Sequence, residues 1–198
     1  IYDTTRTIRN RVTRIANALH TDTRERTIRE NLFIREGKPL NPYRVADNER
    51  YLRDLDFILD SKIIVLPIEG TSDSVDLQIL TRDVFSLGID ASSDDIDEYT
   101  VGLYDANLFG RGQRIQADIG FDPDRNPITD YDLYYRKASL GGSLVNTALG
   151  YTRLNNARSV GEEFEHAYFL RLDRPLVSPY SRLAGGLEIS NNWSRNVY

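Results

Sequence analysis

Every second residue is apolar in several stretches of the C-terminal half, and this rhythm constrains the fold more than any other feature of the sequence. Ile115, Ala117, Ile119 and Phe121, for example, alternate with polar residues and a glycine. A period of two is typical of a β-strand with one apolar and one polar face. The pattern predicts about six strands. They span residues 99–108, 112–122, 130–139, 143–154, 163–174 and 181–192.

Short turn sequences separate these predicted strands. Gly110-Arg111-Gly112, Gly141-Gly142 and Asn155-Asn156 all stand between alternating stretches. Because strands joined by short turns pair antiparallel, the region is predicted to be an antiparallel meander. Leu108-Phe109-Gly110 and Leu140-Gly141-Gly142 each end one strand and open the next, which indicates repeated hairpins.

The first 60 residues have helical rather than strand periodicity. A first amphipathic helix is predicted from a stripe of four apolar residues: Ile8, Val12, Ile15 and Leu19. A second helix is expected to begin at Thr23 as its N-cap, to carry Ile28 and Leu32, and to end at Glu36-Gly37-Lys38-Pro39. A third should run from Pro42 to about Leu55, with Asn41 as N-cap before the proline.

Two strands and an acidic stretch follow the predicted helices. Residues 63–68 and 75–79 should form a hairpin across the turn 69–73. Residues 1–89 are therefore predicted to be a small α+β unit. The run 90–98, DASSDDIDE, is interpreted as an acidic linker because its like charges repel and little apolar surface is available for burial.

Composition excludes several classes of protein. With 40% hydrophobic residues and a mean hydropathy of -0.47, the chain has no stretch of about 20 apolar residues that could cross a bilayer as a helix. Strands of a membrane barrel need only about 10 residues of alternating polarity, so a β-barrel is compatible with this composition. The net charge of -5 argues against nucleic acid as a partner.

No arrangement of residues indicates catalysis or a cofactor. The sequence has no cysteine, and neither His20 nor His166 stands beside a nucleophile motif. No phosphate loop, dinucleotide loop or zinc spacing occurs. We therefore expect no enzyme activity, no cofactor and no metal.

One stretch has the oxygen spacing of a calcium loop. Asp122, Asp124 and Asn126 alternate, but Pro127 stands where such a loop needs glycine. A hairpin turn is the preferred interpretation.

Several motifs together resemble one family, and they occur in its order along most of the chain. Glu36-Gly37-Lys38-Pro39-Leu40, then residues 48–55 (NERYLRDL) and residues 81–87 (TRDVFSL) resemble the last POTRA domain of the BamA-like barrel-assembly superfamily. Residues 104–112 (YDANLFGRG) are similar to the first barrel hairpin of that family. Arg174-Pro175-Leu176 with residues 178–180 and 184–186 is similar to its fifth and sixth strands.

The resemblance implies a fold, a location and a function. It implies a POTRA-like periplasmic domain at residues 1–89, then the N-terminal part of an antiparallel transmembrane β-barrel at 99–198, in the outer membrane of a Gram-negative bacterium. The six predicted strands are fewer than the eight of the smallest such barrels, so the barrel is partial. The family's periplasmic domains receive clients by strand addition, and its barrel opens between the first and last strands. The implied function is assembly or translocation of unfolded outer-membrane or secreted proteins, with the lipid bilayer and periplasmic accessory proteins as further partners.

Two places on the chain are predicted to pair with client strands. The first is the strand 99–108 as the barrel seam, with Val101, Leu103, Tyr104 and Asn107, because Gly102 and Asp105 weaken pairing there. The second is the edge of the predicted hairpin, with Ile63, Val65, Leu77 and Ile79. A tapering strand and an ordinary strand edge are the simpler alternatives at these two places.

Two other functions fit the same pattern. A soluble binding module with an antiparallel β-barrel or sandwich would turn its apolar faces and its many tyrosines inward. A membrane anchor for an upstream domain would have the same fold as the assembly protein. In a membrane barrel the apolar faces point outward and the aromatic residues form girdles at the interfaces.

Overall fold

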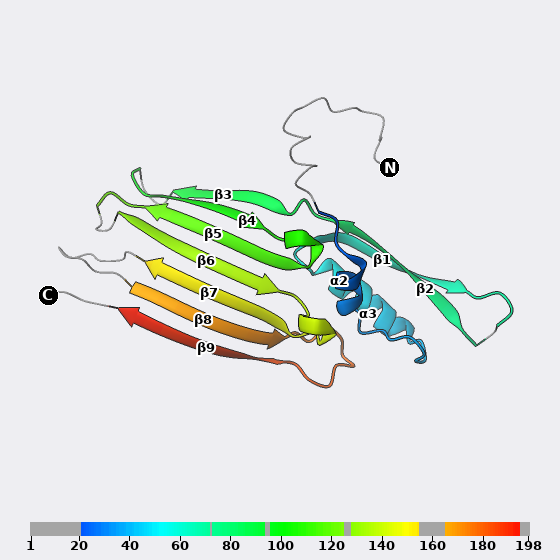
Figure 1. The fold of residues 1–198 in the computed structure, drawn as a ribbon. Helices are drawn as coiled ribbons and strands as arrows, with labels where there is room; N and C mark the ends of the chain where they lie inside the picture. Colours follow the sequence, from blue (N-terminus) through cyan, green and yellow to red (C-terminus); the bar gives the residue numbers. More distant parts are fainter. Residues whose placement is uncertain (1–20, 72, 94–95, 125–127, 155–164, 195–198) are drawn as a thin grey trace, which may run out of the picture.

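The computed structural model describes residues 21–71, 73–93, 96–124, 128–154 and 165–194. In this part of the chain two helices and a two-stranded hairpin form a small N-terminal unit, and seven further strands form one long sheet (Figure 1). The helix predicted from Ile8 to Leu19 lies outside the described residues. No helix within the described ranges has the length and apolar character needed to cross a membrane.

Helix α3 (Pro42–Arg53) confirms its predicted start. The Asn41 side chain accepts a hydrogen bond from the Tyr43 N–H at 2.9 Å, and Pro42 occupies the first turn, where a missing N–H costs nothing. The helix buries Val45, Leu52 and two further residues against the rest of the unit.

Helix α2 (Glu25–Glu30) is shorter than predicted, and its N-cap is Arg24 rather than Thr23. The Thr23 hydroxyl instead accepts a hydrogen bond from the Asn107 amide at 2.8 Å. The helix ends early because the backbone N–H groups of Phe33 and Ile34 donate to the buried Asn48 side chain of α3. The N–H groups of Phe33 and Ile34 are thus hydrogen-bonded to a side chain that is distant in sequence.

The predicted hairpin is present as β1 (Ile58–Pro67) and β2 (Val75–Asp83). The two strands pair antiparallel, with Ile63 opposite Ile79 and Val65 opposite Leu77. Helix α3 packs against β1.

The long sheet is an antiparallel meander in which each strand pairs with its neighbour in sequence. Its strands are β3 (Leu87–Ser93), β4 (Tyr99–Asp105), β5 (Gln113–Phe121), β6 (Thr129–Lys137), β7 (Asn146–Leu154), β8 (Glu165–Arg174) and β9 (Gly185–Ser194). Short 3-10 turns η1 (Leu108–Gly110) and η2 (Leu140–Gly142) join β4 to β5 and β6 to β7, as the repeated hairpins predict. The described strands form an open sheet with β3 at one edge and β9 at the other.

The prediction of an acidic linker at 90–98 is wrong. Asp90 to Ser93 belong to β3, which pairs with β4 from Leu87–Asp105 to Ser93–Tyr99. Only one carboxylate of the run lies within the strand, and Asp97 and Glu98 follow it in the turn. The described sheet therefore has seven strands rather than six, and the strand starting at residue 99 is not the first.

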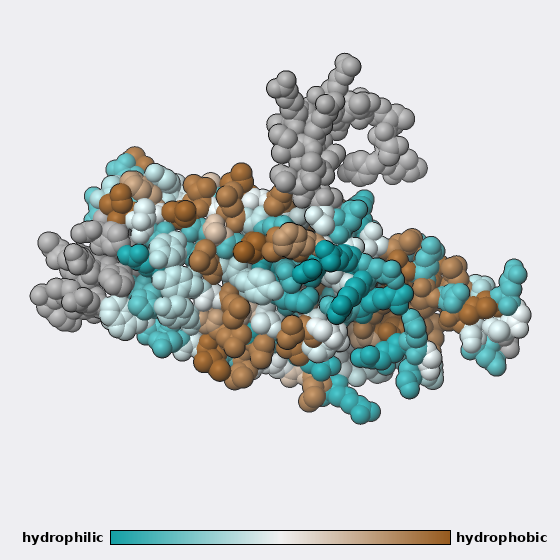
Figure 2. All heavy atoms as spheres, viewed as in Figure 1, coloured by the Kyte–Doolittle hydropathy of each residue, from teal (hydrophilic) through white to brown (hydrophobic). Residues whose placement is uncertain are grey.

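The two faces of the sheet differ in polarity. The register places Leu103 of β4, Ala117 of β5, Leu133 of β6 and Tyr151 of β7 in one row, and the rows on both sides of it are also mainly apolar. Much of this face is exposed, including Ile119 at 59% and Leu133 at 47%. Figure 2 shows brown, apolar residues exposed over the sheet, interspersed with teal and pale ones. The opposite face carries Gln116, Asp118 and Asp132, among other polar side chains.

The buried core lies where the helices meet the sheet. We call this region the junction; its buried residues are Ile28, Phe33, Tyr51, Leu52, Leu55, Phe57, Ile58, Ala138, Leu144 and Val177. Ala138, Leu144 and Val177 come from turns at the helix-side end of the sheet, and the others come from the N-terminal unit. The two parts therefore share one core.

Hydrogen bonds fix the helices to three successive turns of the sheet. The Thr27 hydroxyl donates to the Gly110 carbonyl at 2.9 Å, and the Ser139 hydroxyl donates to the Glu30 carbonyl. The Ser178 hydroxyl donates to the Asp47 carboxylate at 2.6 Å. At Gly110 φ is +68°, and an added Cβ would lie 2.2 Å from the Asp22 carbonyl oxygen, so this contact requires glycine.

Candidate functional site

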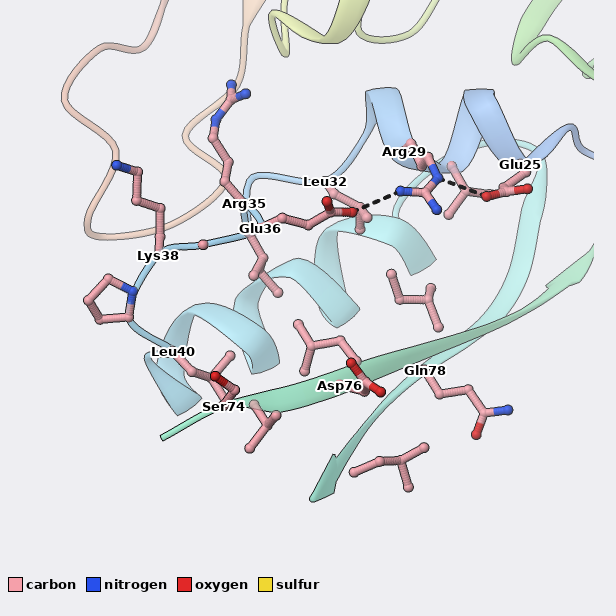
Figure 3. A pocket seen from close by; sticks show the side chains of 18 of the residues that line it. Glu25, Arg29, Leu32, Arg35, Glu36, Lys38, Leu40, Ser74, Asp76 and Gln78 are labelled. Carbon is pink, nitrogen blue, oxygen red and sulfur yellow. Dashed lines mark hydrogen bonds and ion pairs between the residues drawn. The ribbon is translucent and has the colours of Figure 1, made fainter. Parts of the chain in front are cut away.

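An open groove of about 1610 Å³ runs between β2 and the segment from α2 to Leu40 (Figure 3). Its helix-side wall carries Ile28, Leu32, Ile34 and Leu40, and its hairpin-side wall carries Leu66, Val75, Leu77 and Ile79. Each wall thus carries apolar residues among polar and charged ones. A strand edge along such a groove could take an extended segment with apolar side chains at alternate positions.

Charged side chains border the helix side of this groove. Arg29 binds Glu25 at 2.8 Å and Glu36 at 3.1 Å, and these interactions raise the pKa of its guanidinium, the bond to Glu25 most strongly. Arg35 and Lys38 lie on the loop beyond them (Figure 3). These ion pairs are exposed and link α2 to the loop that follows it.

Strand β1 does not offer a free edge next to α3. The Ile63 N–H donates to the Glu49 carboxylate at 2.9 Å, and Arg53 donates to the Ser61 carbonyl at 3.1 Å. The Ile63 hydrogen bond, followed by the bond from Arg53, lowers the pKa of Glu49. Side chains of α3 therefore take the place of a neighbouring strand along this part of β1.

The edge of β2 faces the groove. In an antiparallel pair, opposite residues alternate between those that exchange both hydrogen bonds and those that exchange none. Since the Ile63 N–H points to Glu49, the pair Ile63–Ile79 is of the second kind, and so are the pairs two residues away on either side. The backbone N–H and C=O groups of Leu77, Ile79 and Thr81 consequently point away from β1. All three residues line the groove.

The structure brings the four predicted hairpin residues together on one face. Ile63 and Val65 are opposite Ile79 and Leu77, so all four point the same way. Leu77 and Ile79 line the groove, whereas Ile63 is buried. The sequence predicted the strand pair. It did not predict that Leu32, Ile34 and Leu40 form the facing wall of the groove, because their position opposite β2 depends on how α2 packs.

The four predicted seam residues do not form a site. Val101 and Leu103 lie on the apolar face of β4, Tyr104 lies on the opposite face, and Asn107 is buried in a turn, where it accepts from the Gly112 N–H at 2.8 Å. Strand β4 pairs with both β3 and β5, so its backbone is already engaged. The prediction that this strand opens the sheet is wrong, and β3 holds that edge among the described strands.

Comparisons with known proteins give a relationship of fold. No family model matches the chain, and no curated protein matches it. Among solved structures, it is similar to BamA from Haemophilus ducreyi lacking POTRA domains 1–3, with a TM-score of 0.58 and 17% sequence identity. The match covers 88% of this chain and 34% of that one, so the chain spans about a third of the length of that structure. The chain therefore has a BamA-like fold with a mainly antiparallel sheet.

Proposed function

We propose that the chain is part of a non-enzymatic outer-membrane protein that accepts unfolded client strands for assembly or translocation. The observation that carries this proposal is the combination of an exposed apolar sheet face with the edge of β2, which pairs with no second strand among the described residues and borders a groove that has apolar residues on both walls. The likeness to BamA in fold supports the same assignment.

In this proposal the two parts of the chain lie in different surroundings. The N-terminal unit is a POTRA-type domain in the periplasm of a Gram-negative cell, where client proteins and accessory proteins would meet it. The long sheet is the first part of a transmembrane β-barrel, and its apolar face contacts acyl chains. A soluble module would need a cover for that face, because large exposed apolar surfaces are otherwise rare on soluble proteins.

Client strands would add to β2 inside the groove. The outward N–H and C=O groups of Leu77, Ile79 and Thr81 would supply main-chain hydrogen bonds, and the apolar residues of the two walls would contact alternate side chains of the client. The edge of β3 is a second place for strand addition, since it borders the described sheet. A passive anchor for an upstream domain would need neither edge.

A proline substitution at the β2 edge tests this function. Leu77→Pro removes an N–H that points into the groove and leaves the hydrogen bonds to β1 in place, whereas Leu77→Ala removes only side-chain contacts. We expect Leu77→Pro to abolish most crosslinking of unfolded client proteins to a photoreactive residue at Gln78, and Leu77→Ala to weaken it less. Equal crosslinking by the two variants, at equal protein levels, would contradict strand addition at this edge.

A further inference from the structure

The two strands that each lack a second neighbour among the described residues on one side, β2 and β3, follow one another directly in the chain. Strand β2 ends at Asp83 and β3 begins at Leu87, so residues 84–86 alone connect them. Figure 1 shows β2 leading into β3 through this short connection, with both strands pointing in the same general direction. The two edges therefore belong to one nearly continuous extended stretch, from Val75 to Ser93.

The pairing of the backbone keeps its phase through this connection. At the β2 end, the Val84 N–H donates to the Phe57 carbonyl at 3.1 Å, which continues the pairing with β1. At the β3 end, the Ser86 carbonyl accepts from the Ala106 N–H at 2.8 Å, which extends the pairing with β4. Even-numbered residues thus face the paired side both before and after the connection.

The odd-numbered residues consequently direct their backbone N–H and C=O groups away from the paired strands, because bonded and non-bonded pairs alternate along an antiparallel ladder. In β2 they are the groove residues described above: Leu77, Ile79 and Thr81. In β3 they are the residues that lie between successive bonded pairs with β4: Leu87, Ile89 and Ala91. One two-residue rhythm of outward groups therefore runs through both edges.

The side chains along both edges have the same phase of polarity. Leu77 and Ile79 line the groove, opposite the apolar residues of its helix-side wall. Ile89 is opposite Leu103 on the apolar face of the sheet. A slip of one residue turns every side chain of a strand to the other face. A strand added along both edges without such a slip would keep the same alternate side chains on the apolar side throughout.

We propose that the two edges form one path for a client strand of alternating polarity, which pairs first with β2 in the groove and then with β3 in the same phase. This inference rests on the proposed function, which assigns client strands to each edge separately. From Leu77 to Ala91 the path is about 46 Å long, at about 3.3 Å per residue. A membrane strand of about 10 residues is shorter than the path, so it would move along it from the groove to the sheet.

The phase of pairing can be read from disulfides, because the sequence contains no cysteine. Thr81→Cys in β2 and Ala91→Cys in β3 of the whole protein would each be mixed with client proteins that carry one cysteine at successive positions of a single strand. Under a mild oxidant, a disulfide forms only where the two Cβ atoms lie close together. We expect every second client position to react, and the same alternate positions to react at both sites.

Arg82→Cys and Asp90→Cys are the matched controls for the phase. Their side chains lie one residue away from the tested positions and on the opposite face of the same strands. They should react with the intervening client positions. If Ala91→Cys reacts with the positions that Thr81→Cys leaves unreacted, the path is interrupted and the inference is wrong.

Leu77→Pro decides whether a client must pass β2 to reach β3. Because it removes an outward N–H of β2 and leaves β3 unchanged, we expect it to abolish most disulfides at Ala91→Cys as well as at Thr81→Cys, at equal protein levels. Leu77→Ala should reduce both less. Undiminished reaction at Ala91→Cys in Leu77→Pro would overturn the single path and leave strand addition at β2 intact. Absence of disulfides at Thr81→Cys with every client position would instead overturn the proposed function.

Discussion

The junction and the long sheet bury apolar residues in opposite ways. In the junction, Leu52 is 0% exposed, and Phe57 and Leu144 are buried with it. In the sheet, Leu103 and Ile119 are each 59% exposed, although the sequence pattern around them is as regular as any in the chain. The same residue types thus form a closed core in one part and an open face in the other.

The difference shows that alternation predicts which residues share a face but not what that face contacts. In the junction the protein supplies the apolar surroundings, because α2 and α3 pack on three turns of the sheet. In the sheet, other molecules must supply the apolar surroundings of the exposed face.

The largest effect is expected in the junction. Leu52→Ala should destabilise the protein by about 2 to 5 kcal/mol, because it leaves a cavity in a closed core. Tyr43→Ala on the same helix, where Tyr43 is 73% exposed, should change stability little. Urea denaturation of both variants measures the difference. Similar stability of the two variants would mean that the junction is not a packed core.

A somewhat smaller effect is expected on the apolar face of the sheet. Leu133→Lys should cost about 2 to 4 kcal/mol in a bilayer, the cost of a lysine near the midplane on the outer face of a barrel. Gln116→Lys places the same side chain on the opposite, polar face, where we expect little change. Folding into vesicles, followed by denaturant titration, compares them. If Leu133→Lys left the stability unchanged while Gln116→Lys lowered it, the assignment of the two faces would be reversed and the soluble module would be favoured.

Much of the fold could be predicted from local patterns. All six strands predicted after residue 98 match β4 to β9 within a few residues, because alternating runs such as Ile115–Ala117–Ile119 determine which residues share a face of the strand. The start of α3 could be predicted for an equally local reason, because Asn41-Pro42 is a typical helix N-terminus. Strand β3 was missed because its own sequence, LGIDASS, has weak alternation, and its pairing with β4 decides its structure.

The candidate site depended on contacts that no local pattern contains. The hairpin was predicted, but which of its edges is open depends on Glu49 and Arg53, four residues apart on α3, which cover β1 at Ile63 and Ser61. An i, i+4 Glu–Arg pair is ordinary on a helix surface, so it gave no sign of this role. The groove itself depends on where α2 ends, and the buried Asn48 side chain determines that end.

The smallest effect is expected at the edge of β1 that Glu49 covers, in contrast to the edge of β2 that faces the groove. The folded state lowers the pKa of Glu49, through the Ile63 N–H first and Arg53 second. A carboxylate with a lowered pKa stabilises the folded state above its unfolded pKa, about 4.3 for glutamate, and this contribution is lost as the pH falls through the folded pKa. Wild-type stability should therefore decline below about pH 5, and Glu49→Gln should be less stable at neutral pH and decline less steeply in acid.

Glu25→Gln is the matched control for this titration, because Glu25 forms an exposed ion pair with Arg29 on α2, and exposed pairs contribute little to stability. The pH dependence of the urea midpoint should distinguish the two glutamates. If both variants keep the wild-type acid profile, the Glu49 carboxylate does not hold the edge of β1. If only Glu49→Gln flattens it, α3 is the element that closes one edge of the hairpin, and strand addition to this unit is restricted to β2.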